Sequence, residues 1–181
     1  MGEHPRFWVA FFIMLLAFAF FTIMSVWMTI QAHAEPMPSR PVVNITDDPG
    51  GNVGEYYRKY RAYSEAGTEI HFHGLCASAC TLVFLEEFRV GIRACADEGA
   101  IFGFHQPFQM TADGKVTRTK SARRETRKLW ALWLASLPAP LQKYLKSVRV
   151  PSASEGDEQN TMLVIPGIAL LPRCPVSVAA S

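Results

Sequence analysis

The sequence predicts an α/β domain with a mostly parallel sheet, preceded by one N-terminal hydrophobic helix. Short β-prone runs alternate with segments of helical periodicity, and loops rich in glycine and proline separate them. Apolar residues make up 49% of the 181 residues and charged residues 19%, which is typical of a folded chain rather than a disordered one. Residues 7–34 contain no Asp, Glu, Lys or Arg.

This N-terminal stretch, residues 1–34, predicts export. Residues 7–30 would form a helix of about 36 Å, long enough to cross a bilayer. Ala32-His33-Ala34 has the small-x-small pattern of a signal-peptidase site, which favours cleavage. The apolar run is longer than the ~7–15 residues of an ordinary signal peptide, so we expect an uncleaved membrane anchor, with a cleaved signal as the alternative. The domain then lies in the periplasm or another extracytoplasmic space, tethered or secreted.

The predicted elements follow one another along residues 42–172, after a Pro-containing linker at residues 35–41. The sequence predicts strands at 42–45, 69–73 and 100–104, and helices at 53–66, 77–85 and 121–136. The helix at 77–85 is small and apolar, so we expect it to be buried. Residues 173–181 are expected to form a tail. The four cysteines fit an oxidising compartment, and they allow three complete disulfide pairings among which the sequence does not choose.

Three loops follow the three predicted strands and carry the residues of chemical interest. They contain Gly50-Gly51, Ser78 and His105 respectively. Because binding sites of open α/β sheets lie outside the carboxyl ends of the strands, we expect the three loops to converge. The net charge of +2 is too small to indicate a nucleic-acid partner, so the site is expected to act on something else.

These residue types are those that nucleophilic catalysis requires. A serine nucleophile needs a base to take its proton and N–H donors for the oxyanion. Ser78 lies at the start of a predicted helix between two alanines, and His105 is a suitable base. The Ala79 amide follows the nucleophile, and Gly51 can turn its N–H toward the same site.

The order of these motifs resembles the proteolytic subunit of Clp protease, within the crotonase-like fold. The matching residues are Asp48-Pro49-Gly50-Gly51, Gly74-Leu75-Cys76-Ala77-Ser78 and His105-Gln106-Pro107. Gly51 lies 27 residues before Ser78, and His105 lies 27 residues after it, close to the spacing in that family. The segment Cys76-Ala77-Ser78-Ala79-Cys80 is most similar to an exported branch whose turn reads Cys-x-Ser-Ala-Cys.

The resemblance implies a serine hydrolase of the peptidase type that works through an acyl-enzyme at Ser78. It implies that His105 is the base, that the Gly51 and Ala79 amides bind the oxyanion, and that no cofactor is needed. The substrate would be a peptide or another acyl compound, and the chain would self-associate if it assembles as Clp relatives do. An acid should follow His105 by about fifty residues, and we expect Asp157, with Glu158 and Glu155 as alternatives.

Two alternatives remain open. The Clp family has a strand–helix unit before the first motif, whereas here only the linker separates that motif from the apolar segment. This difference favours an inactive, membrane-tethered scaffold or interaction domain. The second alternative is a metal site, because His71, His73, Cys76 and Cys80 lie within ten residues. The C-x₃-C spacing is unusual for zinc, so we expect a structural disulfide at the turn and no metal.

Overall fold

The computed structural model of the chain describes residues 16, 18–24 and 40–175, and it divides into two units. In the N-terminal unit, residues 18–24 are helical. Within these described residues, no helix has both the length and the apolar character that a membrane crossing requires. Most of the expected anchor at residues 1–34, and the expected linker up to residue 39, lie outside the described residues.

The second unit is a mixed α/β domain with a five-stranded, mostly parallel sheet in its described part. Its strands are β1 (Val42–Asp48), β2 (Glu69–Ala77), β3 (Arg93–Ala96), β4 (Ile101–Phe104) and β5 (Leu163–Pro166). Strand β2 is central, because β1, β3 and β4 all pair with it in parallel. Strand β5 adds to β4 in antiparallel orientation. The predicted α/β class with a mostly parallel sheet is confirmed.

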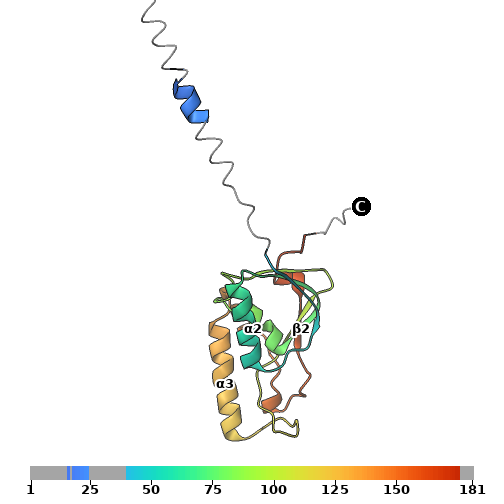
Figure 1. Cartoon of the computed structure of the whole chain (residues 1–181). Coiled ribbons are helices and arrows are strands. Elements are labelled where there is room, and N and C mark those ends of the chain that lie inside the picture. The colour runs from blue at the N-terminus through green and yellow to red at the C-terminus, as the bar shows by residue number, and fades with distance from the viewer. Residues whose placement is uncertain (1–15, 17, 25–39, 176–181) are drawn as a thin grey trace, which may run out of the picture. The chain divides into compact units, whose positions relative to one another are not determined.

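Helices connect these strands (Figure 1). The helices of the domain are α2 (Val53–Glu65), η1 (Ser78–Phe84), α3 (Lys120–Ala135), α4 (Ala139–Ser147), η2 (Ala153–Glu155) and η3 (Gly167–Ala169). The Asn52 side chain accepts a hydrogen bond from the Glu55 amide, and the Thr119 side chain accepts one from the Ala122 amide. These two caps satisfy N–H groups that a helix start leaves unpaired.

The hydrophobic core lies between the sheet and η1. Phe72, Phe84, Phe102 and Phe104 are almost completely buried there. The Phe84 ring contacts the Phe102 ring edge-on with their centroids 4.8 Å apart, and Phe72 contacts Phe102 in the same way at 4.9 Å. Such aromatic pairs stabilise a core beyond their burial alone. The core therefore fixes η1 against β2 and β4, the elements that border the candidate site.

Several boundaries differ from the prediction. Strand β2 continues through Gly74 to Ala77, and the expected buried helix is a 3₁₀ helix that begins only at Ser78. Gly74 is required because a Cβ there would lie 1.8 Å from the Thr46 carbonyl oxygen, at an irregularity in the β1–β2 pairing. Strands β3 and β5 and helix α4 were not predicted. The chain also stays attached to the sheet beyond residue 172, because Cys174 forms a disulfide with Cys95.

Candidate active site

Ser78 lies in a sharp turn where β2 meets η1. The strand ends at Ala77, and the 3₁₀ helix begins at Ser78 itself. Ser78 has φ of +55° and is the only non-glycine residue in the described part of the chain with a positive φ. A side chain in this left-handed region costs roughly 1–2 kcal/mol, and backbone strain of this kind clusters at functional sites. A strained strand-to-helix turn is also the geometry that exposes a nucleophilic serine in hydrolases.

A disulfide between Cys76 and Cys80 closes this turn, with the two Cα atoms 5.3 Å apart. The expected disulfide at the turn is therefore confirmed. Because both sulfur atoms are used in this bond, the pair offers no thiolate, and the metal site expected as an alternative from His71, His73, Cys76 and Cys80 is not formed as proposed.

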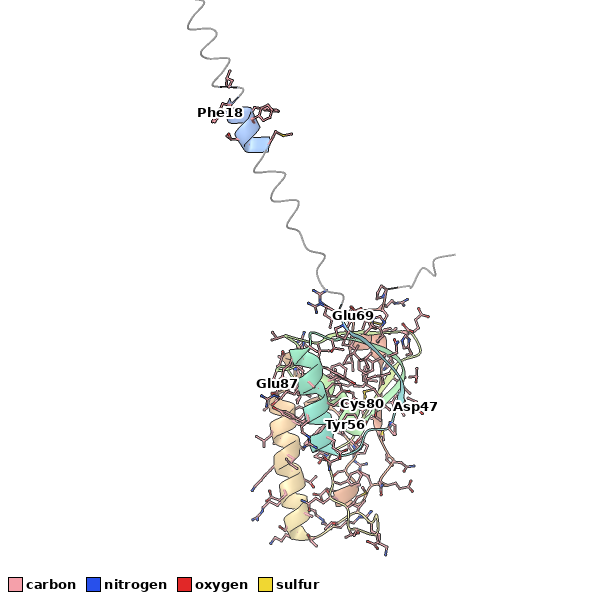
Figure 2. The ribbon with its side chains drawn as sticks, viewed as in Figure 1. Phe18, Asp47, Tyr56, Glu69, Cys80 and Glu87 are labelled. Atoms are coloured by element: carbon pink, nitrogen blue, oxygen red, sulfur yellow. A yellow bond between two sulfur atoms is a disulfide. The ribbon has the colours of Figure 1, made fainter. Side chains whose placement is uncertain are left out.

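Hydrogen bonds hold the same turn from two sides. The Tyr60 hydroxyl donates to the Cys80 carbonyl at 2.8 Å, and burial raises the pKa of Tyr60, which keeps the hydroxyl protonated as a donor. The Thr81 hydroxyl donates to the Ser78 carbonyl at 2.6 Å. Figure 2 shows Tyr56 and Cys80 toward the carboxyl end of β2, away from Glu69. The backbone of the turn is thus fixed, while the Ser78 hydroxyl has no hydrogen-bond partner among the described residues.

The loop after β1 packs directly on this turn through Gly50. Gly50 has φ of +84°, and a Cβ at this position would lie 2.4 Å from the Ala77 carbonyl oxygen and 2.8 Å from the Ala79 nitrogen. Distances this short leave space for a hydrogen atom only. The first and second expected loops therefore touch each other, as the prediction of convergence requires.

The Asp48 carboxylate holds this loop in place. One of its oxygens accepts hydrogen bonds from the Gly50 amide at 3.0 Å and from the Tyr56 hydroxyl, and the other lies 3.3 Å from the Lys59 ammonium. Burial, followed by the hydrogen bond to Asp48, raises the pKa of Tyr56, so this hydroxyl also stays a donor. The neighbouring Gly51 amide donates to no acceptor among the described residues.

His105 follows β4, the strand that pairs with the end of β2. In the pairing register Gly103 lies opposite Ala77, so His105 leaves the sheet beside Ser78. The Nδ1 atom of His105 lies 2.7 Å from the Gln106 carbonyl oxygen. A carbonyl can only accept, so Nδ1 carries the proton and Nε2 keeps its lone pair. Burial lowers the pKa of His105, and the hydrogen bond to Gln106 opposes this shift.

Ser78 and His105 line one cavity of about 320 Å³. The other residues of this cavity come mainly from α3 and η1, with two from α2, and they are mostly apolar. They are Val53, Tyr57, Ala79, Thr81, Leu82, Leu85, Glu87, Pro107, Leu129, Trp130, Leu132, Trp133 and Ser136. Among the residues expected at the site, the structure thus brings Ser78, His105 and Ala79 to one cavity. Gly50 packs against the turn, whereas Gly51 does not line this cavity.

The Asp157 carboxylate bonds to residues other than His105. One carboxylate oxygen of Asp157 accepts a hydrogen bond from the Ser152 amide at 2.8 Å, and the other lies 2.6 Å from the Arg149 guanidinium. The Ser152 amide and the Arg149 charge lower the pKa of Asp157. Glu155 pairs with Arg127 at 2.5 Å. No carboxylate in the described part of the chain hydrogen-bonds to His105, so the structure does not bring the expected acid to the base.

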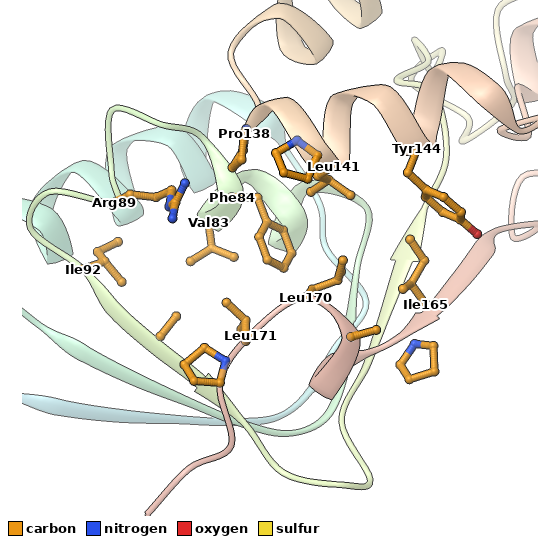
Figure 3. Close-up of a pocket in the computed structure, with 15 residues that line it drawn as sticks. Val83, Phe84, Arg89, Ile92, Pro138, Leu141, Tyr144, Ile165, Leu170 and Leu171 are labelled. Atoms are coloured by element: carbon orange, nitrogen blue, oxygen red, sulfur yellow. The ribbon is translucent and has the colours of Figure 1, made fainter.

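A larger cavity of about 780 Å³ lies against the other end of η1 (Figure 3). Its walls include Val83 and Phe84 from η1, Leu141 from α4 and Ile165 from β5. The cavity is mostly apolar, and neither Ser78 nor His105 lines it. The smaller cavity is therefore the one that combines a nucleophile with a base.

The sequence reasoning missed the residues that support the site from behind. Asp48 carries a recognisable signal, because an Asp just before a Pro-Gly turn commonly accepts the backbone N–H two residues further on. Tyr56 and Tyr60 stand four residues apart and share one face of α2, which their spacing also predicts. The role of the Gln106 carbonyl has no sequence signal, because every residue has such a group.

Comparison with models of known protein families and with curated proteins gives no match for this chain.

Proposed function

We propose that the chain is an exported, membrane-tethered hydrolase of the Clp protease type, which cleaves a peptide or another acyl compound through an acyl-enzyme at Ser78. The observation that carries this proposal is the strained conformation of Ser78 in a cavity that it shares with His105. The two disulfides fit an oxidising compartment outside the cytoplasm.

Each step of the reaction has a residue to perform it. The Nε2 atom of His105 accepts the Ser78 proton while the serine oxygen attacks the acyl carbonyl carbon. The amides of Gly51 and Ala79 stabilise the negative charge that develops on the carbonyl oxygen. His105 then returns the proton to the leaving group, and water releases the acyl group by the same route.

In this proposal, a main-chain group orients the His105 ring. In a serine–histidine–aspartate triad, the acid holds the imidazole in the tautomer that can accept the serine proton. Here the Gln106 carbonyl, 2.7 Å from Nδ1, serves that purpose. It selects the same tautomer but brings no negative charge to stabilise the imidazolium. The proposed site is therefore a dyad, which we expect to be slower than a triad.

A fluorophosphonate probe tests this proposal. We expect the oxidised, full-length chain to be labelled at Ser78, as identified by mass spectrometry of the modified peptide, and Ser78→Ala to abolish labelling. Ser136→Ala is the matched control, because Ser136 lines the same cavity and its side chain bonds to the Leu132 carbonyl. Failure of the folded chain to react at Ser78 would favour the second candidate, an inactive scaffold. This candidate is supported by the finding that no carboxylate among the described residues hydrogen-bonds to His105.

The pH dependence of labelling provides a further prediction. Only neutral His105 can accept the proton, so the rate rises with pH through the pKa of this residue. Because burial lowers that pKa, the midpoint is expected below the ordinary value of about 6.5. A rate profile of the probe reaction between acidic and neutral pH measures it. A midpoint well above the ordinary value would instead indicate a carboxylate paired with the ring.

A further inference from the structure

The second disulfide lies beside a histidine. His71 on β2 stands directly opposite Cys95 on β3 in the pairing register. The last described residues run along the other side of β3, where the Cys174 amide donates to the Ala96 carbonyl at 3.2 Å. As a result, a ring nitrogen of His71 and the sulfur atoms of Cys95 and Cys174 lie within 4.8 Å of one another. We call these three residues the His71 trio.

The disulfide of the trio is more accessible than the one at Ser78. Cys76 and Cys80 are completely buried, whereas Cys174 is half-buried. Thiol–disulfide exchange requires a thiolate to reach one of the two sulfur atoms. A dithiol reductant therefore meets the Cys95–Cys174 bond first.

We propose that reduction of the Cys95–Cys174 disulfide converts the His71 trio into a zinc site. A dithiol donates two electrons and two protons to the disulfide and becomes a disulfide itself, which leaves two cysteine thiols. Zinc then binds both sulfur atoms as thiolates and releases two protons. The His71 imidazole supplies the third ligand, and water fills the fourth position. Reoxidation by a disulfide donor removes both thiolates and expels the ion.

The spacing and chemistry of the trio suit this metal. Two thiolates and an imidazole are ligands that zinc prefers, and its bond lengths of about 2.0–2.3 Å place tetrahedral ligand atoms roughly 3.3–3.8 Å apart. The ligand atoms of the trio already lie within 4.8 Å of one another. The Glu69 carboxylate lies 2.7 Å from Nε2 of His71, so it can orient the ring as a second-shell partner.

The proposed zinc site is separate from the proposed hydrolase site. Glu69 begins β2, whereas Cys80 lies beyond the end of this nine-residue strand, and Figure 2 shows the two residues apart. The zinc proposal therefore does not depend on activity at Ser78.

Cobalt binding tests the zinc proposal, because Co²⁺ replaces zinc and absorbs visibly when thiolates bind it. The full chain, kept in solution with mild detergent, is reduced under native conditions, and alkylation with mass spectrometry identifies the reduced pair. We expect Cys95 and Cys174 to be modified first, and the reduced chain to bind one Co²⁺ with thiolate-to-metal absorption that zinc displaces. The oxidised chain should bind none at this position.

Variants show whether the trio is responsible. His71→Ala is expected to weaken the affinity more than about tenfold, since second-shell changes alone cost that much. His73→Ala is the matched control, because His73 is two residues away on the same strand and its ring nitrogens bond to Asp97 and Asn44. Equal loss in both variants, absorption from Cys76 and Cys80, or a reduced chain that neither binds Co²⁺ nor recovers its near-UV circular dichroism with zinc would overturn the proposal.

Discussion

Replacement of Gly50 by alanine is expected to destabilise the domain by more than about 3 kcal/mol, because two penalties combine. The backbone at this position has φ of +84°, which disfavours any side chain. The added methyl group would also lie 2.4 Å from the Ala77 carbonyl oxygen, in the turn that presents Ser78. Urea unfolding of the variant measures the loss of stability, and phosphonate labelling of the folded fraction measures the damage to the site.

Gly114→Ala is the matched control for this substitution. Gly114 has a similar φ of +79°, but a Cβ there would meet no atom within 4 Å. The loss of stability in Gly114→Ala should therefore be limited to the cost of a side chain at positive φ, roughly 1–2 kcal/mol. If the two variants unfold at the same urea concentration, the close approach of the Gly50 loop to the turn does not matter for stability.

Replacement of His105 by glutamine is expected to slow phosphonate labelling of Ser78 by roughly 100- to 10,000-fold, the usual contribution of a general base. Asp157→Asn should leave the labelling rate unchanged, because Asp157 bonds to Ser152 and Arg149 rather than to His105. Initial rates with a fluorescent phosphonate, measured on both variants at the same pH, compare the two effects.

The Asp157 variant distinguishes a dyad from a triad. Loss of a triad acid lowers turnover by about 10⁴-fold in serine proteases. A comparable loss of labelling in a folded Asp157→Asn variant would show that the Asp157 carboxylate acts as the triad acid. Circular dichroism of the variant is the necessary check, since Asp157 also accepts a hydrogen bond from the Ser152 backbone.

The sequence was sufficient to predict the part of the fold that carries the loops. The sequence is β-prone at residues 42–45, 69–73 and 100–104. The first two ranges lie within β1 and β2, and the third matches β4 except for its first residue. Their parallel pairing follows from the helices between them. Because parallel strands bring their carboxyl ends to one edge, the meeting of the Gly50 loop, Ser78 and His105 could be anticipated.

The remaining elements depend on contacts that local patterns do not report. Strand β3 is four residues long and contains Arg93, Cys95 and two alanines, so it has little β character of its own. It forms because β2 offers it a pairing edge. The strand predicted at residues 69–73 ends before Gly74, whereas in the structure β2 continues through this glycine, which allows the close approach of β1 to β2. Helix α4 begins at Ala139, and Pro140 lies in its first turn, where proline is tolerated.

The acid at His105 could not be predicted from spacing alone. The segment from Ser154 to Asn160 contains three carboxylates, and the sequence does not tell which of them, if any, reaches the ring. In the structure, Arg127 and Arg149 attract two of these carboxylates to other partners. Long-range pairing of this kind depends on where α3 and α4 pack, which the local sequence does not encode.

The Cys76–Cys80 disulfide closes a short covalent ring around Ser78, so the geometry of this residue depends on whether the surroundings are oxidising. Ser78 is the middle residue of this five-residue ring, so the ring constrains the residue on both sides at once. Thiols remain reduced in the cytoplasm and are oxidised after translocation. In the proposed exported protein, the ring would therefore close, and Ser78 would reach its final conformation, only after translocation.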